Sequence, residues 1–160
     1  MDVILMKIEN VPGTSLMTGF TGQIEAMSYS HGVAMQVTGD VSNTERTSGK
    51  PRHQDFMITK YLDKASPLLN QKCCEGTDLG TVLITVGRND NGSVIPLIVY
   101  TLSNAVLSSV NVGGGGGDKP VESLALNYSG IKWDFTAQKE AGGKDGTVAG
   151  SWDLGKNAKS

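Results

Sequence analysis

Apolar and polar residues alternate along most of this chain with a period of two, which is the pattern of β-strands. The alternation runs through residues 3–8, 80–88 and 121–135, and residues 55–62 are rich in β-formers. It also continues from 94 to 112, which would span about 60 Å at about 3.3 Å per residue, against about 20 Å for a usual strand. We therefore predict a bend at Asn104–Ala105 and, from the Asn91-Gly92 pair, a hairpin just before this segment.

The segment 121–135 changes the parity of its apolar residues halfway along. Leu124 and Leu126 share one parity, whereas Ile131 and Trp133 take the other. One extra residue at Ser129-Gly130 would turn both sets toward the same core, so we predict a β-bulge there. Long, curved strands of this kind favour a sheet that closes into a barrel.

Residues 22–37 form one extended segment in which neither face is uniformly apolar. One face carries Ile24, Ala26, Ser28 and Ser30, and the other carries Gln23, Glu25, Met27, Tyr29 and His31. A small barrel needs only one wetted face, so the second half-polar face indicates a subunit contact or the wall of a water-filled pore. A ring built from one repeated contact makes such a pore, and the sequence therefore predicts an oligomer.

A single short helix is predicted at about 66–75. Ser66 is suited to the N-cap, Pro67 to the first turn and Gly76 to the C′ position. The 3.6-residue period places Leu68, Leu69, Lys72 and Cys73 on one face. Isolated helices shorter than about 12 to 15 residues are marginal in water, so we expect this helix to be held against a sheet.

Two polar segments predict loops. Residues 38–51 have no period and are rich in turn formers, and loops this long are usually functional or disordered, so a functional loop and a mobile hairpin tip both remain open. The five glycines at 113–117 connect two strands. They do not make a phosphate-binding loop, because Lys119 is followed by Pro120 and a strand pattern instead of a helix.

Composition places the chain among mainly β proteins with a single domain spanning residues 1–160. The 160 residues include 21 glycines and carry a formal net charge of −2, with a pI of about 5.6. Because the basic residues are scattered, we expect no nucleic-acid partner. There is no apolar run of membrane-spanning length and no secretory leader at the N-terminus, so we expect a cytosolic start and no membrane insertion.

No catalytic, cofactor or metal site stands out. His31, His53, Cys73 and Cys74 lack the spacing of zinc ligands. The two cysteines are adjacent, which fits ordinary disulfide geometry poorly, so we expect two thiols. Serines and histidines occur without a nucleophile elbow, and the carboxylates fit turns and cross-strand pairs. We therefore expect no enzyme.

Five segments occur in a set order along the chain. They are MKIENVPGTS at 6–15, GQIEAMSYSHG at 22–32, FMITKYLDKASPLL at 56–69, SSVNVGGGGGDKPVESLALNYSGIKWDF at 108–135 and GSWDLGKN at 150–157. As an ordered set they resemble the haemolysin-coregulated protein (Hcp) family, the tube protein of the bacterial type VI secretion system. Two departures are the inserted Ser151 and His31, where family members often have Trp.

The resemblance implies a single-domain β-barrel of two sheets with one flanking helix, assembled into a hexameric ring. Stacked rings would form the inner tube that a contracting sheath expels together with the spike, with effector proteins in the lumen. The lumen-facing residues implied are Ser30, Ser28 and Ile24. The loop implied to meet the next ring contains Thr38, Val41, Thr44, Arg46 and Lys50.

The partners implied are further copies of the chain, the spike, sheath and baseplate proteins, and effectors. The protein would reside in the bacterial cytoplasm during assembly and then reach the medium or a target cell. The alternative hypothesis is a monomeric secreted β-module that binds carbohydrate or peptide.

Overall fold

The strands form two main sheets and a small hairpin. The computed structural model describes residues 2–37, 39, 49–138 and 144–160. The six-stranded sheet contains, in spatial order, β12 (Lys144–Asp153), β11 (Gly130–Gln138), β8 (Ser93–Ser103), β7 (Val82–Asp90), β1 (Asp2–Ile8) and β2 (Ile24–Ala26). The four-stranded sheet contains β3 (Ser28–Ser30), β6 (Phe56–Tyr61), β10 (Val121–Asn127) and β9 (Val106–Gly113), and the hairpin pairs β4 (Val33–Ala34) with β5 (Arg52–His53). All neighbouring strands are antiparallel.

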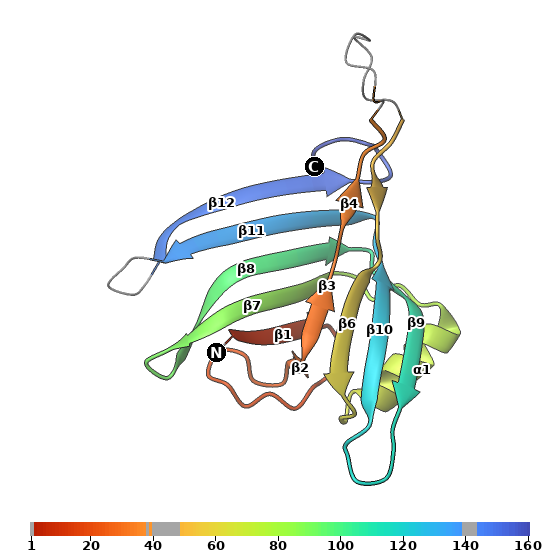
Figure 1. The fold of residues 1–160 in the computed structure, drawn as a ribbon, viewed down its shortest axis with the longest axis vertical. Helices are drawn as coiled ribbons and strands as arrows, with labels where there is room; N and C mark the ends of the chain where they lie inside the picture. Colours follow the sequence, from red (N-terminus) through yellow and green to blue (C-terminus); the bar gives the residue numbers. More distant parts are fainter. Residues whose placement is uncertain (1, 38, 40–48, 139–143) are drawn as a thin grey trace.

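The chain passes directly between the two main sheets at three corners, namely β2 to β3, β8 to β9 and β10 to β11, and it crosses once more through α1 (Ser66–Glu75), which connects β6 to β7. The strands of the larger sheet run across the view in Figure 1, and those of the smaller sheet run steeply through it, so the sheets cross at a large angle. The bend predicted at Asn104–Ala105 is confirmed, because Asn104 adopts a positive φ of 50° between β8 and β9. Two sheets joined by such corners make the two-sheet barrel expected from the sequence.

The hydrophobic core fills the space between the sheets. The smaller sheet contributes the buried side chains of Leu124 and Leu126, and the larger sheet contributes Ile84 and Leu102. Each fully buried side chain of this kind contributes on the order of 1.5 to 3 kcal/mol. The predicted hairpin at Asn91-Gly92 is also present, with positive φ at both residues.

Two strand predictions are wrong, and both fail at a corner. The bulge expected at Ser129-Gly130 is not there, because β10 ends at Asn127 and the chain joins the other sheet as β11 at Gly130. The ladder between β9 and β10 shifts instead between Ala125 and Leu126. The single extended segment expected at 22–37 is divided into β2, β3 and β4, which belong to three different sheets.

The helix α1 (Ser66–Glu75) lies beside β9 at the edge of the smaller sheet (Figure 1). Leu69 is buried while Leu68 and Cys73 pack against the core, which confirms the predicted apolar face. Gly76 ends the helix with φ of 62° and donates its N–H to the carbonyl of Cys73, as predicted. The predicted N-cap is wrong, because Ser66 is already the first helical residue and makes no capping hydrogen bond.

Candidate functional site

The outward face of the four-stranded sheet carries a row of small polar side chains. Thr59 of β6 pairs with Ser28 of β3 on one side and with Ser123 of β10 on the other. Asn111 of β9 pairs with Ser123 and completes the row across all four strands. The four side chains are exposed or half-buried. The strand neighbours of the two central members, Thr59 and Ser123, are buried on the opposite face. We call these four residues the polar row.

The three residues predicted to face a lumen do not share one face. Ser28 and Ser30 are exposed on the outward face of the smaller sheet. Ile24 is 0% exposed within the core, so its prediction as a lumen residue is wrong. The reason is the corner at Met27, where the chain leaves the larger sheet and reverses which parity faces the core. Tyr29, of the opposite parity to Ile24, therefore also packs against the core.

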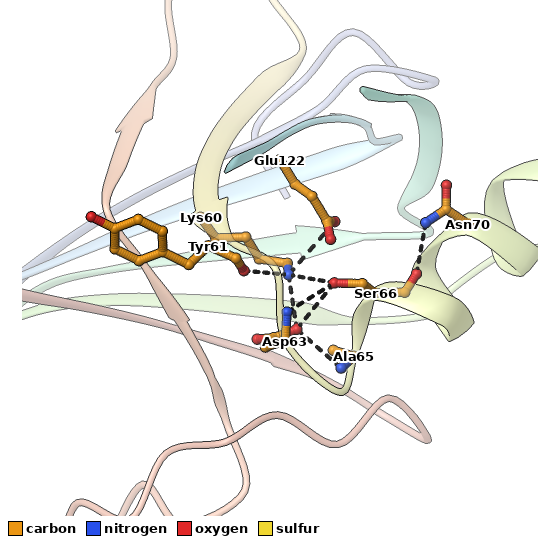
Figure 2. A network of polar contacts seen from close by, with 7 residues as sticks. All are labelled: Lys60, Tyr61, Asp63, Ala65, Ser66, Asn70 and Glu122. Atoms are coloured by element: carbon orange, nitrogen blue, oxygen red, sulfur yellow. Dashed lines mark hydrogen bonds and ion pairs between the residues drawn. The ribbon is translucent and has the colours of Figure 1, made fainter. Parts of the chain in front are cut away.

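A buried ammonium group lies at one end of the smaller sheet (Figure 2). Lys60 Nζ donates to Asp63 Oδ1 at 2.8 Å, to Ser66 Oγ at 3.2 Å and to the carbonyl of Tyr61 at 3.1 Å. Glu122 Oε2 on β10 lies 3.6 Å from the same nitrogen, and the side chains of Lys60 and Glu122 are both 0% exposed. This cluster, which we call the Lys60 network, joins the end of β6 to the start of α1.

The turn between β6 and α1 is shaped around this ammonium group. Asp63 Oδ1 accepts the N–H of Ala65 at 3.0 Å, and Ser66 Oγ accepts the N–H of Asp63 at 3.1 Å. Asn70 donates its side-chain amide to the carbonyl of Ser66 at 2.8 Å (Figure 2). Ser66 fails as an N-cap because its hydroxyl turns back toward Lys60 and Asp63. The network fixes the end of β6 relative to the helix without offering a reactive group to solvent.

Two histidines meet at the base of the β4–β5 hairpin. The ring centroids of His31 and His53 are 6.4 Å apart, and the Tyr128 hydroxyl oxygen lies 3.3 Å from Nδ1 of the first and 3.4 Å from Nδ1 of the second. Tyr128 donates its proton to the carbonyl of Gln54 at 3.0 Å. The buried Nε2 atoms of both rings have no hydrogen-bond partner among the described residues. Burial lowers the pKa of both imidazoles, and the nearby His53 lowers that of His31 further.

The sequence does not predict that these two histidines lie close to each other. They lie on either side of the long loop and carry no recognisable spacing, so only the three-dimensional pairing of β4 with β5 joins them. His31 stands against Trp133, with ring centroids 6.1 Å apart. His31 therefore belongs to this aromatic cluster and not to the polar row.

The β4–β5 hairpin, with the described residues 35–37 and 49–51 that adjoin it, forms an arm that projects from the body of the molecule (Figure 1). Val33, Met35 and Val37 are exposed along it. Lys50, one of the predicted ring-contact residues, is exposed as well. The others lie outside the described residues, and these are Thr38, Val41, Thr44 and Arg46.

Other chemistry is sparse in the part of the chain that the structure describes. No group of three or more His, Cys, Asp or Glu side chains there is placed to hold a metal ion. Cys73 is half-buried and Cys74 is exposed, and both are free thiols, as predicted. The described residues include no helix with both the length and the apolar character needed to cross a membrane.

Comparison with known proteins gives consistent results. The family described as "Type VI secretion system effector, Hcp" matches residues 5–135. The protein hcp1 of Pseudomonas aeruginosa is 32% identical over 108 residues, which cover 66% of this chain and 67% of that protein. A solved structure of a type six secretion system protein superposes with a TM-score of 0.92 at 22% identity and 100% coverage of both chains. The crystal structure of Hcp1 from Salmonella typhimurium gives a TM-score of 0.81 at 19% identity, with 99% of each chain covered.

These matches, taken with the two-sheet fold, define a structural protein of type VI secretion. The chain belongs to the Hcp family of type VI secretion tube proteins. It is a component of the secretion tube, and hexameric assembly is known for its family. The comparisons give no support to the alternative of a monomeric β-module.

Proposed function

We propose that six copies of this chain form a ring whose channel is lined by the outward face of the four-stranded sheet. The observation that carries this proposal is the polar row of Ser28, Thr59, Ser123 and Asn111. It crosses every strand of the sheet on the side opposite the core. Ser30, exposed on the same face, extends this lining toward the arm.

The chemistry of the polar row suits a passage for folded cargo. Hydroxyl and amide groups hold water and exchange hydrogen bonds with it at little net cost, since protein–water and protein–protein bonds are of similar strength. The row contains no charged side chain and no large apolar one. Effector proteins in such a channel would be held weakly enough to be released. In this proposal the protein acts by shape and mechanical displacement, without a catalytic step.

The lining role is tested at Ser30. We expect Ser30→Glu to leave hexameric rings intact while reducing the amount of effector that co-purifies with them, because six added carboxylates would crowd one level of the channel. Ser30→Ala is the matched control and should retain cargo. Ring assembly is checked by gel filtration with light scattering. Unchanged cargo retention in Ser30→Glu would refute the assignment of this residue to the channel.

The rings stack, in this proposal, through the arm and through the loop 38–51. Replacing Val41 by Asp should preserve single rings and stop tube growth, because an unpaired carboxylate at a contact carries a desolvation cost. Electron microscopy of the variant distinguishes rings from tubes. Tubes of normal length would count against a stacking role for the loop.

The remaining partners follow from the place of a tube in a secretion apparatus. The outer surface of the ring would meet sheath proteins, and the tube ends would meet the spike and the baseplate. The protein would assemble in the bacterial cytoplasm and leave the cell with the expelled tube. Pull-down of sheath and spike proteins with the assembled tube, but not with single rings, is the corresponding test.

A further inference from the structure

A hollow surface lies at the end of the smaller sheet that is farthest from the arm. Two adjoining depressions of about 500 and 290 Å³ meet where β3 begins, β6 ends and the β9–β10 loop closes. Both are lined by Tyr61 and Lys119, the first also by Met27 and Asp118, and the second also by Leu62. We call these five residues the basal groove.

The basal groove exposes three large apolar side chains close to one another. Met27, Tyr61 and Leu62 are each 46% exposed. Lys119 Nζ stands 5.7 Å from the centre of the Tyr61 ring, so a cation covers one aromatic face. Large apolar side chains grouped in a hollow and edged by charged residues are the arrangement of a protein contact with an apolar centre and a polar rim.

The arm offers the complementary surface. Val33, Met35 and Val37 are 48%, 43% and 52% exposed, and they recur at every second residue, which makes a stripe along one side of extended chain. Lys50 and Arg52 are exposed on the returning side of the arm. The arm therefore presents an apolar stripe accompanied by two cations.

The charges of the two surfaces are of opposite sign. Glu25 lines the second depression and is exposed, and Asp118 lines the first. Together they outweigh the single cation of Lys119. An arm that brings Lys50 and Arg52 to this rim would place them against carboxylates, which favours correct orientation of the two surfaces.

The arm and the basal groove lie at opposite ends of the same strands. Met27 precedes β3 and Tyr61 ends β6, whereas the arm leaves from the other end of β3 and returns to the start of β6 (Figure 1). A copy displaced along the strand direction would bring its groove to the arm of the first. Such a contact joins two different surfaces, so it repeats without closing and produces a filament of stacked rings.

We propose that the Val33–Met35–Val37 stripe of one copy docks in the basal groove of a second copy in the next ring. The inference rests on the proposed stacking of rings and identifies the surface that receives the arm. The stripe fills the hollow beside Tyr61 and Leu62, and Arg52 meets the acidic rim.

Directed cross-linking tests this pairing in assembled tubes. In a background of Cys73→Ala and Cys74→Ser, one protein carries Val37→Cys and another carries Leu62→Cys. Rings of each are assembled into mixed tubes and oxidised. The pairing predicts disulfide-linked heterodimers in tubes and a large loss of them in dispersed rings, because the linked residues belong to different rings. Neither protein assembled alone should yield comparable dimers.

A matched control uses Val148→Cys, which replaces a valine of β12, the edge strand of the larger sheet, where the side chain is 72% exposed. Mixed with Val37→Cys it should give no heterodimer. In a second measurement, Leu62→Asp should leave rings intact and stop tube growth, whereas Val148→Asp should permit tubes. Tubes that form without the Val37–Leu62 cross-link would overturn the basal groove while leaving stacking intact. Absence of rings from the unaltered protein would overturn the proposed function, and the inference with it.

Discussion

The Lys60 network makes a quantitative prediction about folding. Lys60→Met keeps a long flexible side chain in place and removes the ammonium group. Asp63 would still accept the N–H of Ala65, but the carboxylate of Glu122 would lose the one cation that lies near it in the described part of the chain. Both oxygens of Glu122 already lack hydrogen-bond partners among the described residues. The variant therefore leaves a buried charge with nothing to offset it.

The expected cost follows from the ion pair that is broken. Breaking a buried ion pair by removing one partner typically costs about 3 to 5 kcal/mol, because the remaining charge stays buried without compensation. We therefore expect Lys60→Met to lower the free energy of unfolding by about 3 to 5 kcal/mol at pH 7.

A double variant tests whether the unpaired carboxylate causes this loss. Lys60→Met with Glu122→Leu should recover most of it, because an apolar pair can replace a buried ion pair. Urea unfolding at one fixed protein concentration measures both variants, since subunit association also contributes to stability. A loss below about 1 kcal/mol for Lys60→Met, or no recovery in the double variant, would refute the reasoning.

Three further predictions concern other parts of the fold. Burial lowers the pKa of His31 and His53 below 6.5, so the unfolded chain binds more protons than the folded chain near that pH. The free energy of unfolding should therefore fall as the pH drops below about 6.5 and level off below the folded pKa values. His31→Phe should flatten this decline in urea titrations at pH 7.5 and 5.5, and an unchanged slope would contradict it. Gly13→Ala would place a Cβ against the backbone carbonyl group of Gln23, so we expect the free energy of unfolding to fall by about 1 to 3 kcal/mol in thermal or urea unfolding. A neutral effect would show that the loop shifts freely. Gly76→Ala forces a left-handed conformation at the end of α1 and should cost about 1 to 2 kcal/mol by the same assay, with Asn in its place costing less.

Local patterns were sufficient to predict individual elements of this fold. The alternation at residues 3–8 and 80–88 predicted β1 and β7, and Asn91-Gly92 predicted the hairpin that follows, because each depends on neighbours in sequence. The end of the helix at Gly76 was predicted for the same reason. Excess length located the bend at Asn104, since no single strand could extend so far.

The corners between the sheets were not predictable in the same way. A period of two reports which residues share a face, but it does not tell which sheet that face belongs to. At Met27 the chain changes sheets within a continuous extended segment. A period of two therefore places Ile24 on the same face as Ser28 and Ser30, although Ile24 lies in the core and only the two serines are exposed. The bulge predicted at Ser129-Gly130 is wrong for a related reason. A change of sheet reverses the parity of the core-facing residues just as a bulge does, so the sequence pattern cannot distinguish the two.

The site residues depend on contacts between distant parts of the sequence. The pairing of Lys60 with Glu122 across two strands cannot be recognised in either local sequence. Each residue is a single charged position within a strand pattern, and nothing nearby in the sequence indicates its partner. The meeting of His31 and His53 likewise follows from the pairing of β4 with β5. Only the polar character of residues 22–37 suggested a wetted surface in advance.

Electron cryo-microscopy of the purified chain tests the central claim most directly. We expect annular particles of six copies in which the four-stranded sheet faces the central channel and Ser28 and Ser30 point into it. Rings in which this sheet faces outward, or single subunits at every concentration examined, would contradict the account.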